Sequence, residues 1–174
     1  MHTSVSIGVD VFEPNFSDFG VFYPLQTFNK DIELTISEIT FCVEGNSKEF
    51  EKELIEIAEN ISSNVITMNS EQRKQLHIAA VFACNFSNHM YSIADHLLAE
   101  KHIDFKILLP LIKQTIAKLD KNKPKEVQTG PAKRKEAAII QEHIATIKEQ
   151  EIKELYQKIS ANIIKHQGYG IKIK

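Results

Sequence analysis

The side chains best suited to proton transfer or substrate binding lie between residues 77 and 96. At 100° per residue, a helix over this stretch carries a set of polar side chains on one side: His77, Asn85, Asn88, Ser92, Asp95 and His96. A histidine exchanges a proton near pH 7, and an asparagine amide can orient a carbonyl or carboxylate group. We therefore interpret His77 and Asn85 as candidate catalytic residues of a substrate pocket and Asn88 as a candidate substrate-binding residue. The sequence leaves open the alternative that His77 and Asn85 are hydrogen-bonded polar residues inside a core.

A second candidate site begins at Thr129-Gly130-Pro131. Thr or Gly at the cap, followed by Pro at the first helical position, is typical of a helix start, whose free N–H groups favour anions. Arg134 follows directly and could hold a carboxylate or a phosphate in a bidentate fork. Thr129 and Arg134 are therefore predicted to bind substrate, although the same residue types also begin ordinary helices.

Other catalytic arrangements fit the sequence less well. His77, His89 and His96 are too widely spaced for a helical zinc site, which uses i, i+4 pairs. No nucleophile elbow of the G-x-S-x-G type is present. Cys42 and Cys84 lie among apolar neighbours, where a free cysteine usually acts as a small hydrophobic residue. We predict no metal site and no hydrolytic triad.

Composition is typical of a globular protein. Of the 174 residues 43% are apolar and 25% are charged, with 6 Gly and 5 Pro, which excludes a collagen-like or largely disordered chain. No apolar run reaches the ~18–20 residues of a membrane-spanning helix. The first residues lack the basic start and apolar core of a signal peptide. We expect a cytoplasmic protein without membrane contact.

Charge is distributed unevenly along the chain. Residues 1–69 carry 12 Asp or Glu against 3 Lys or Arg, and residues 70–174 carry 11 against 18. The basic excess is densest from Lys113 to Lys135, where a solvated helix end with its loop, or an anion site, is expected. No aromatic residues are interleaved there and the pI is about 6.4, so we predict no nucleic-acid partner.

Residues 1–69 are predicted to form a short α/β segment. Residues 21–23, 39–43 and 65–68 are rich in β-branched or aromatic side chains and are predicted strands. Asn46 and Glu49 have the spacing of a capping box that would open a helix between the second and third strands.

Residues 70–167 are predicted to be helical. Asn69 and Gln72 form a second capping box, and no Gly or Pro follows before about Glu100, which predicts one long helix. Its apolar arc includes Phe82 and Phe86, and further apolar residues flank His77. A helix that is apolar nearly all round should be buried in a larger core or an oligomer interface. Further helices are predicted over 104–119, from 129 with an apolar stripe at Ile140, Ile144 and Ile147, and over 152–163, before a loose tail or edge strand at 168–174.

Three ordered motifs resemble a known family: residues 77–86 (HIAAVFACNF), 108–111 (LLPL) and 129–136 (TGPAKRKE). Similar motifs occur in a C-terminal helical domain of unknown function that follows a Rossmann-like domain in NADP-dependent oxidoreductases. Those proteins are related to pyrroline-5-carboxylate reductase and the 6-phosphogluconate dehydrogenase group. Upstream, residues 2–4 (HTS) and 20–28 (GVFYPLQTF) resemble the last part of the nucleotide domain. The resemblance runs from about residue 2 to residue 165.

The resemblance implies a mainly α fold. A helical domain like the C-terminal domain of 6-phosphogluconate dehydrogenase (70–167) would follow an α/β remnant of a Rossmann-like domain (1–69). Ser4 and Gln26 would border the nicotinamide of NADP, and His77, Asn85, Thr129 and Arg134 would line the substrate side. A homodimer formed through the helical domain is also implied. This sequence departs from the family at Val5, where glycine is usual, and at Glu136, where aspartate is commoner.

No G-x-G-x-x-G turn and no G-x-x-x-x-G-K-[ST] phosphate loop occur anywhere in the sequence. The sequence therefore predicts the C-terminal part of an NADP-dependent oxidoreductase for a small carbonyl or imine compound, truncated and inactive alone because the nucleotide-binding half is missing. A non-enzymatic helical dimerisation or binding module, or one half of a split enzyme, is the alternative. The substrate, and the choice between NAD and NADP, are not determined by the residues present.

Overall fold

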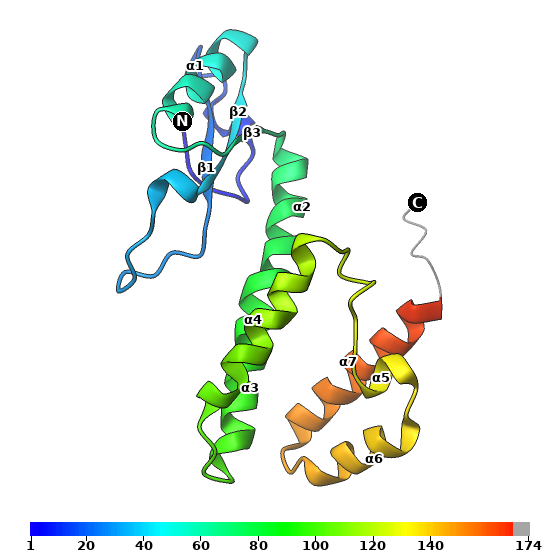
Figure 1. The fold of residues 1–174 in the computed structure, drawn as a ribbon. Coiled ribbons are helices and arrows are strands. Elements are labelled where there is room, and N and C mark those ends of the chain that lie inside the picture. The colour runs from blue at the N-terminus through cyan, green and yellow to red at the C-terminus, as the bar shows by residue number, and fades with distance from the viewer. Residues whose placement is uncertain (169–174) are drawn as a thin grey trace. The chain divides into compact units, whose positions relative to one another are not determined.

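The computed structural model describes residues 1–168 and is mainly helical, with one three-stranded sheet (Figure 1). It divides into two compact units, Met1–Met90 and Tyr91–Lys174. The boundary lies inside α3 (Ser87–Ala99), whereas the predicted domain division falls after residue 69. From residue 169 on, the tail predicted at 168–174 lies outside the residues that the structure describes.

The sheet belongs to the first unit. β1 (Gly20–Leu25) is antiparallel to β2 (Thr40–Gly45), and β2 is parallel to β3 (Val65–Thr67). The helix α1 (Lys48–Glu59) connects the two parallel strands, and His2 adds an isolated parallel bridge to Val21. Two short 3-10 turns, η1 (Val9–Phe12) and η2 (Ile36–Glu38), precede β1 and β2. The three predicted strands are confirmed, with ends shifted by at most two residues.

The core of this unit lies between the sheet and α1. Its buried members are Phe22, Ile39, Phe41, Val43, Leu54 and Ala58. The i, i+4, i+8 spacing of Phe50, Leu54 and Ala58 puts them on one face of α1, toward the strands. The rings of Phe22 and Phe41 are 5.0 Å apart between centroids, across the antiparallel pair. Aromatic side chains on neighbouring strands therefore supply much of the apolar contact.

The start of α1 differs from the prediction. Ser47, rather than Asn46, is the N-cap, and its side chain accepts a hydrogen bond from Phe50 N. The Asn46 side chain instead accepts from Phe19 N and donates to Ser17 O, which joins the turn after β2 to the segment before β1. A capping motif in sequence does not reveal such a long-range competitor, so the predicted box is wrong by one residue.

A buried ion pair holds the start of the long helix. Arg73 of α2 (Ser70–Ala80) has a side chain only 1% exposed, and its Nη1 donates to Oε2 of Glu44 at the end of β2. Its Nη2 donates to Ile7 O and to Ser70 Oγ. The other Glu44 oxygen accepts from Ser70 N at 2.9 Å. These four residues thus tie β2, α2 and the N-terminal segment together.

The long helix is continuous in sequence but not uniform. The Asn69–Gln72 capping box is confirmed, with both reciprocal hydrogen bonds present. After α2 the chain forms a π-helical segment, η3 (Val81–Phe86), before α3. A π-helical turn contains more residues than an α-helical one, so side chains on either side of η3 do not keep the 100° phase used for prediction.

The second unit starts with the end of α3 and a short helical segment. η4 (Phe105–Leu108), α4 (Leu109–Ala117) and η5 (Lys118–Asp120) occupy the predicted range 104–119. Pro110 lies in the first turn of α4, where its missing N–H leaves no helical hydrogen bond unmade. The Asp104 side chain caps η4 by accepting from Lys106 N.

The predicted third helix is broken into two. α5 (Pro131–Arg134) ends after one turn because Lys135 is left-handed, with φ of 59°, and α6 (Ala137–Thr146) follows. Ile147 lies beyond the end of α6, so the expected stripe of three isoleucines does not continue to it. α7 (Gln150–Gly168) confirms the predicted fourth helix, and the buried residues Ala132, Ile140 and Ser160 come from α5, α6 and α7.

Two ion pairs join α3 to the segment between α6 and α7. His96 Nε2 lies 3.0 Å from Glu149 Oε1, and Lys148 Nζ lies 3.0 Å from Glu100 Oε2. The hydrogen bond from His96 lowers the pKa of the Glu149 carboxyl. Among residues 1–168, no helix is long and apolar enough to cross a membrane.

We predict that Arg73→Ala destabilises the first unit by about 3–5 kcal/mol, because Glu44 would be left without its cation in a mostly buried position. Urea unfolding followed by circular dichroism measures this loss. The control is Lys74→Ala, an exposed neighbour on the same helix, whose effect should stay within about 0.5 kcal/mol. Equal effects of the two substitutions would contradict the role given to the ion pair.

Candidate functional site

The predicted catalytic residues lie on the long helix and are exposed. His77 is in the last turns of α2, Asn85 is in the π-helical segment η3, and Asn88 is in the first turn of α3. All three belong to the first unit and are exposed in the single chain. They are therefore not core residues of this unit, which argues against the alternative that His77 and Asn85 are buried structural polar groups.

The expected apolar arc of this helix is also largely exposed. Phe82 is 65% exposed and Phe86 is 49% exposed, and their rings pack edge to face at 4.9 Å. Cys84, between them, is exposed too, so its expected role as a small buried hydrophobic residue is wrong. Cys42 is buried as expected, and burial raises the pKa of its thiol, which disfavours the reactive thiolate.

The predicted substrate residues Thr129 and Arg134 lie in the second unit, Thr129 directly before Gly130 and Arg134 at the end of α5. α5 has only four residues, so it lacks the aligned peptide dipoles that make a helix start attractive to anions. The proposed anion site at the free N–H groups of this helix is therefore not supported by the fold. What the turn does present is the Arg134 side chain.

Arg134 makes a two-pronged ion pair with Glu136. Its Nε donates to Glu136 Oε1 and its Nη2 donates to Glu136 Oε2, both at 2.8 Å. These hydrogen bonds raise the pKa of the Arg134 guanidinium and lower the pKa of the Glu136 carboxyl. The Glu136 carboxylate therefore keeps its charge to a lower pH than a glutamate without such a partner.

The predicted cofactor-side residues flank β1. Ser4 follows the His2 bridge by two residues, and its backbone N donates to His2 Nδ1. Gln26 follows the last residue of β1, and its Oε1 accepts from the backbone N of Thr27 at 2.7 Å. Both side chains are half-buried. Their predicted role beside a nicotinamide stays a prediction.

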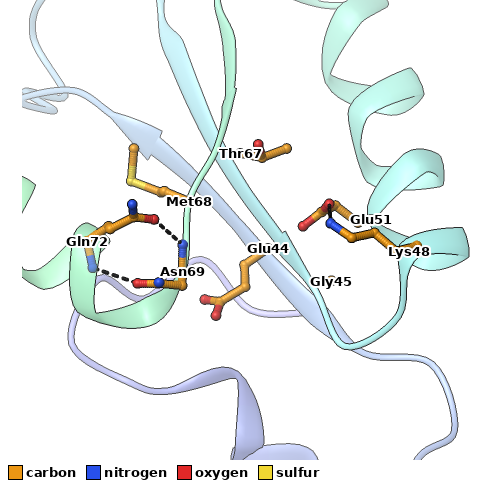
Figure 2. Close-up of a pocket in the computed structure, with 8 residues that line it drawn as sticks. All are labelled: Glu44, Gly45, Lys48, Glu51, Thr67, Met68, Asn69 and Gln72. Atoms are coloured by element: carbon orange, nitrogen blue, oxygen red, sulfur yellow. Dashed lines mark hydrogen bonds and ion pairs between the residues drawn. The ribbon is translucent and has the colours of Figure 1, made fainter.

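A cavity of about 280 Å³ lies elsewhere in the first unit, at the carboxyl ends of the parallel strands (Figure 2). Eight residues line it: Glu44, Gly45, Lys48, Glu51, Thr67, Met68, Asn69 and Gln72. None of the predicted site residues is among them. The sequence analysis missed this cavity, although two strand ends followed by two helix starts are a signal that could have located it.

The cavity does not fit the pyrophosphate of a dinucleotide. Such a group needs a glycine-rich turn that lets backbone N–H groups approach closely. Here the turn from β2 to α1 has one glycine, and a Cβ on Gly45 would lie 2.5 Å from Glu51 N. The two carboxylates in the lining are already paired, Glu44 with Arg73 and Glu51 with Lys48, so the cavity offers no unpaired cation to a phosphate. Among residues 1–168, no group of three or more His, Cys, Asp or Glu is placed to hold a metal ion.

Comparison with known proteins identifies the family. The family model DUF2520, described as a domain of unknown function, matches residues 39–163. The chain belongs to this family. No curated protein matches the chain.

Two solved structures resemble this DUF2520 chain. The structure titled "putative NADP oxidoreductase BF3122 from Bacteroides fragilis" is 42% identical, with a TM-score of 0.89 over 94% of this chain. This chain spans 64% of that protein, less than two thirds of its length. Protein TM1727 from Thermotoga maritima has a TM-score of 0.74 at 23% identity, over 96% of this chain and 68% of the other, and shows the fold alone. The DUF2520 chain is thus similar, over most of its length, to a solved protein named as a "putative NADP oxidoreductase".

The turn that carries Arg134 yields a prediction. Gly130 has φ of 97° and ψ of 175°, a region that essentially only glycine adopts, although a Cβ there would meet no atom within 4 Å. Gly130→Ala should therefore destabilise the second unit by about 1–3 kcal/mol through backbone strain alone. Thermal unfolding measures the change, with Lys125→Ala in the preceding loop as the control. An unchanged melting temperature in Gly130→Ala would show that the turn is not held in this conformation.

Proposed function

We propose that this chain is the substrate-side and dimerisation part of an NADP-dependent oxidoreductase that acts on a small carbonyl or imine compound. The observation that carries the proposal is the 42% identity, over 94% of the chain, to the Bacteroides fragilis protein named for NADP oxidoreduction. The chain spans only 64% of that protein. The whole protein would therefore draw its nucleotide-binding part from residues outside the match.

In this proposal the chain's own residues bind the substrate and move a proton. His77 donates a proton to the carbonyl oxygen or imine nitrogen as it is reduced, and Asn85 and Asn88 orient the reacting group. Thr129 and Arg134 hold an anionic end of the substrate. Ser4 and Gln26 border the nicotinamide, and the cofactor supplies the hydride when bound. His77 and Asn85 are exposed in the single chain, so the pocket that this proposal requires would form only where another subunit or domain covers them.

The cofactor would not be held by this chain alone. The sequence has no glycine-rich dinucleotide turn, and at Gly45, where β2 turns into α1, the backbone is crowded by Glu51. The described residues therefore do not fit the phosphate portion of NADP. We propose that this chain by itself is catalytically inactive.

The exposed apolar side chains of the long helix support a homodimer. Ile78, Phe82 and Phe86 follow at four-residue spacing and are each about half exposed or more. Burying a side chain of this size stabilises an interface by about 1.5–3 kcal/mol. A second copy of this helix would cover such a stripe and place His77 and Asn85 near the interface.

A non-enzymatic binding module, or one half of a split enzyme, is the second candidate. The observation that favours it is that no predicted site residue lines the described cavity. The DNA just upstream of the Met1 codon separates the two forms. An open frame encoding a strand and a glycine-rich turn supports a single longer enzyme, and an adjacent separate gene supports a split one.

Calorimetric titration of the purified chain with NADPH tests the cofactor argument. We expect no saturable binding in the micromolar range, because the pyrophosphate contacts are missing. Titration of the chain together with a nucleotide-binding half, once identified, is the matched comparison and should restore binding. Micromolar binding to the chain alone would contradict the proposed dependence on a second half.

Sedimentation velocity tests the dimer. Phe82→Glu should weaken self-association by roughly 30-fold, because it replaces a large apolar contact with a charge at the centre of the proposed interface. Gln75→Glu adds the same charge at an exposed position of α2 and serves as the control. A monomeric native chain, or equal effects of the two substitutions, would refute the interface.

A further inference from the structure

The segment that carries Arg134 is held in an unusual backbone conformation. Gly130 before α5 and Lys135 after it both have positive φ, 97° and 59°, so the single helical turn is bracketed by two uncommon conformations. Left-handed φ is uncommon for a residue with a Cβ, and such residues cluster at functional sites. Ala132, in the middle of α5, is buried and holds the turn in the second unit. The backbone of this turn is therefore held in one conformation, which fixes the positions from which its side chains extend.

The left-handed Lys135 brings two side chains together that a helix would keep apart. Residues i and i+2 of an α-helix do not face each other, yet Arg134 and Glu136 form two hydrogen bonds of 2.8 Å. The Glu136 N–H also donates to Pro131 O at 3.0 Å, which fixes Glu136 to the start of the same turn. The backbone geometry and the ion pair thus support each other.

The ion pair uses only one of the two edges of the guanidinium. Glu136 occupies the Nε–Nη2 edge, and no partner of Nη1 lies among the described residues. The Nη1–Nη2 edge presents two parallel N–H donors, the arrangement that matches a carboxylate. The Arg134 side chain is 58% exposed, so this edge is open to a ligand.

We propose that Glu136 is a positioning residue, which holds Arg134 so that its Nη1–Nη2 edge binds the carboxylate of a substrate. That the bound carboxylate belongs to a substrate rests on the proposed function, but carboxylate binding at Arg134 does not require that function. The negative charge of Glu136 lies within one guanidinium of the bound anion, and it repels a phosphate dianion about twice as strongly as a carboxylate. Lys133 and Lys135 attract both anions, and they attract the dianion about twice as strongly. Glu136 therefore reduces the preference for phosphate that these cations alone would give.

The two arginines of the chain make a direct test possible. The sequence contains only Arg73 and Arg134, so the full chain with ¹⁵N-labelled arginine gives two Nε–H signals, and buried Arg73 is the internal control. Sodium acetate and sodium phosphate are titrated at pH 7 and constant ionic strength, since screening changes with salt. We expect acetate to shift the Arg134 signal in a saturable way and neither anion to shift Arg73.

Three variants separate positioning from charge. Glu136→Gln should speed hydrogen exchange at Arg134 Nε. It should raise the acetate midpoint roughly 3- to 10-fold, because losing the fixed orientation of one flexible side chain outweighs losing a repulsion that acts through solvent at this exposed turn. It should also raise phosphate affinity relative to acetate. Glu136→Asp keeps the charge and should largely restore the native acetate midpoint. Arg134→Lys, which lacks the fork, should weaken acetate binding.

The outcomes are decisive for the inference and independent of the oxidoreductase proposal. No acetate shift at Arg134, an unchanged acetate midpoint in Glu136→Gln, or no rise of phosphate affinity relative to acetate in that variant would each overturn it. Acetate binding is read without NADPH and without turnover. Failure of the NADPH experiments would therefore leave this result standing, and failure here would leave the cofactor argument untouched.

Discussion

The buried pair of Arg73 and Glu44 is the constraint on which the first unit depends. A charged side chain that is 1% exposed is costly unless it is paired and hydrogen-bonded, and Arg73 meets that condition through Glu44, Ile7 O and Ser70 Oγ. Its partners come from the end of β2, the first turn of α2 and the N-terminal segment. The direction in which the long helix leaves the sheet is thereby fixed. The position of every side chain on α2 follows from this attachment.

The long helix combines polar side chains suited to chemistry with apolar side chains that the single chain leaves uncovered. Ile78, Phe82 and Phe86 are exposed beside His77 and Asn85, and soluble proteins rarely expose a run of large apolar residues without a partner surface. The π-helical segment η3 adds to this, because such segments are rare and occur frequently at functional sites. We interpret this part of the chain as one that acts only when covered by another subunit or domain.

In the second unit, the turn at residues 130–136 holds the Arg134 cation in a defined orientation. An exposed arginine normally samples many rotamers, and an exposed ion pair contributes little to stability. The turn at residues 130–136 uses two positive-φ positions and a bidentate carboxylate to restrict Arg134. The Arg134–Glu136 ion pair therefore acts by orienting Arg134 and adds little to stability, in keeping with a binding role.

The sequence by itself determined the order and kind of most elements. Strand propensity located β1, β2 and β3, the Asn69–Gln72 capping box placed the start of α2, and Thr129-Gly130-Pro131 marked the start of α5, because these signals act over a few neighbouring residues.

Tertiary structure decided the rest. The Asn46 side chain does not cap α1, because it hydrogen-bonds to partners 27 and 29 residues away. The π-helical segment η3 changes the angular spacing of the polar side chains predicted on one side of the long helix. Arg73 forms its ion pair with Glu44, which lies 29 residues earlier in the chain. The left-handed backbone at Lys135 ends α5 after one turn. Each of these depends on groups distant in the chain or on a single backbone angle, which neither periodicity nor local motif can encode.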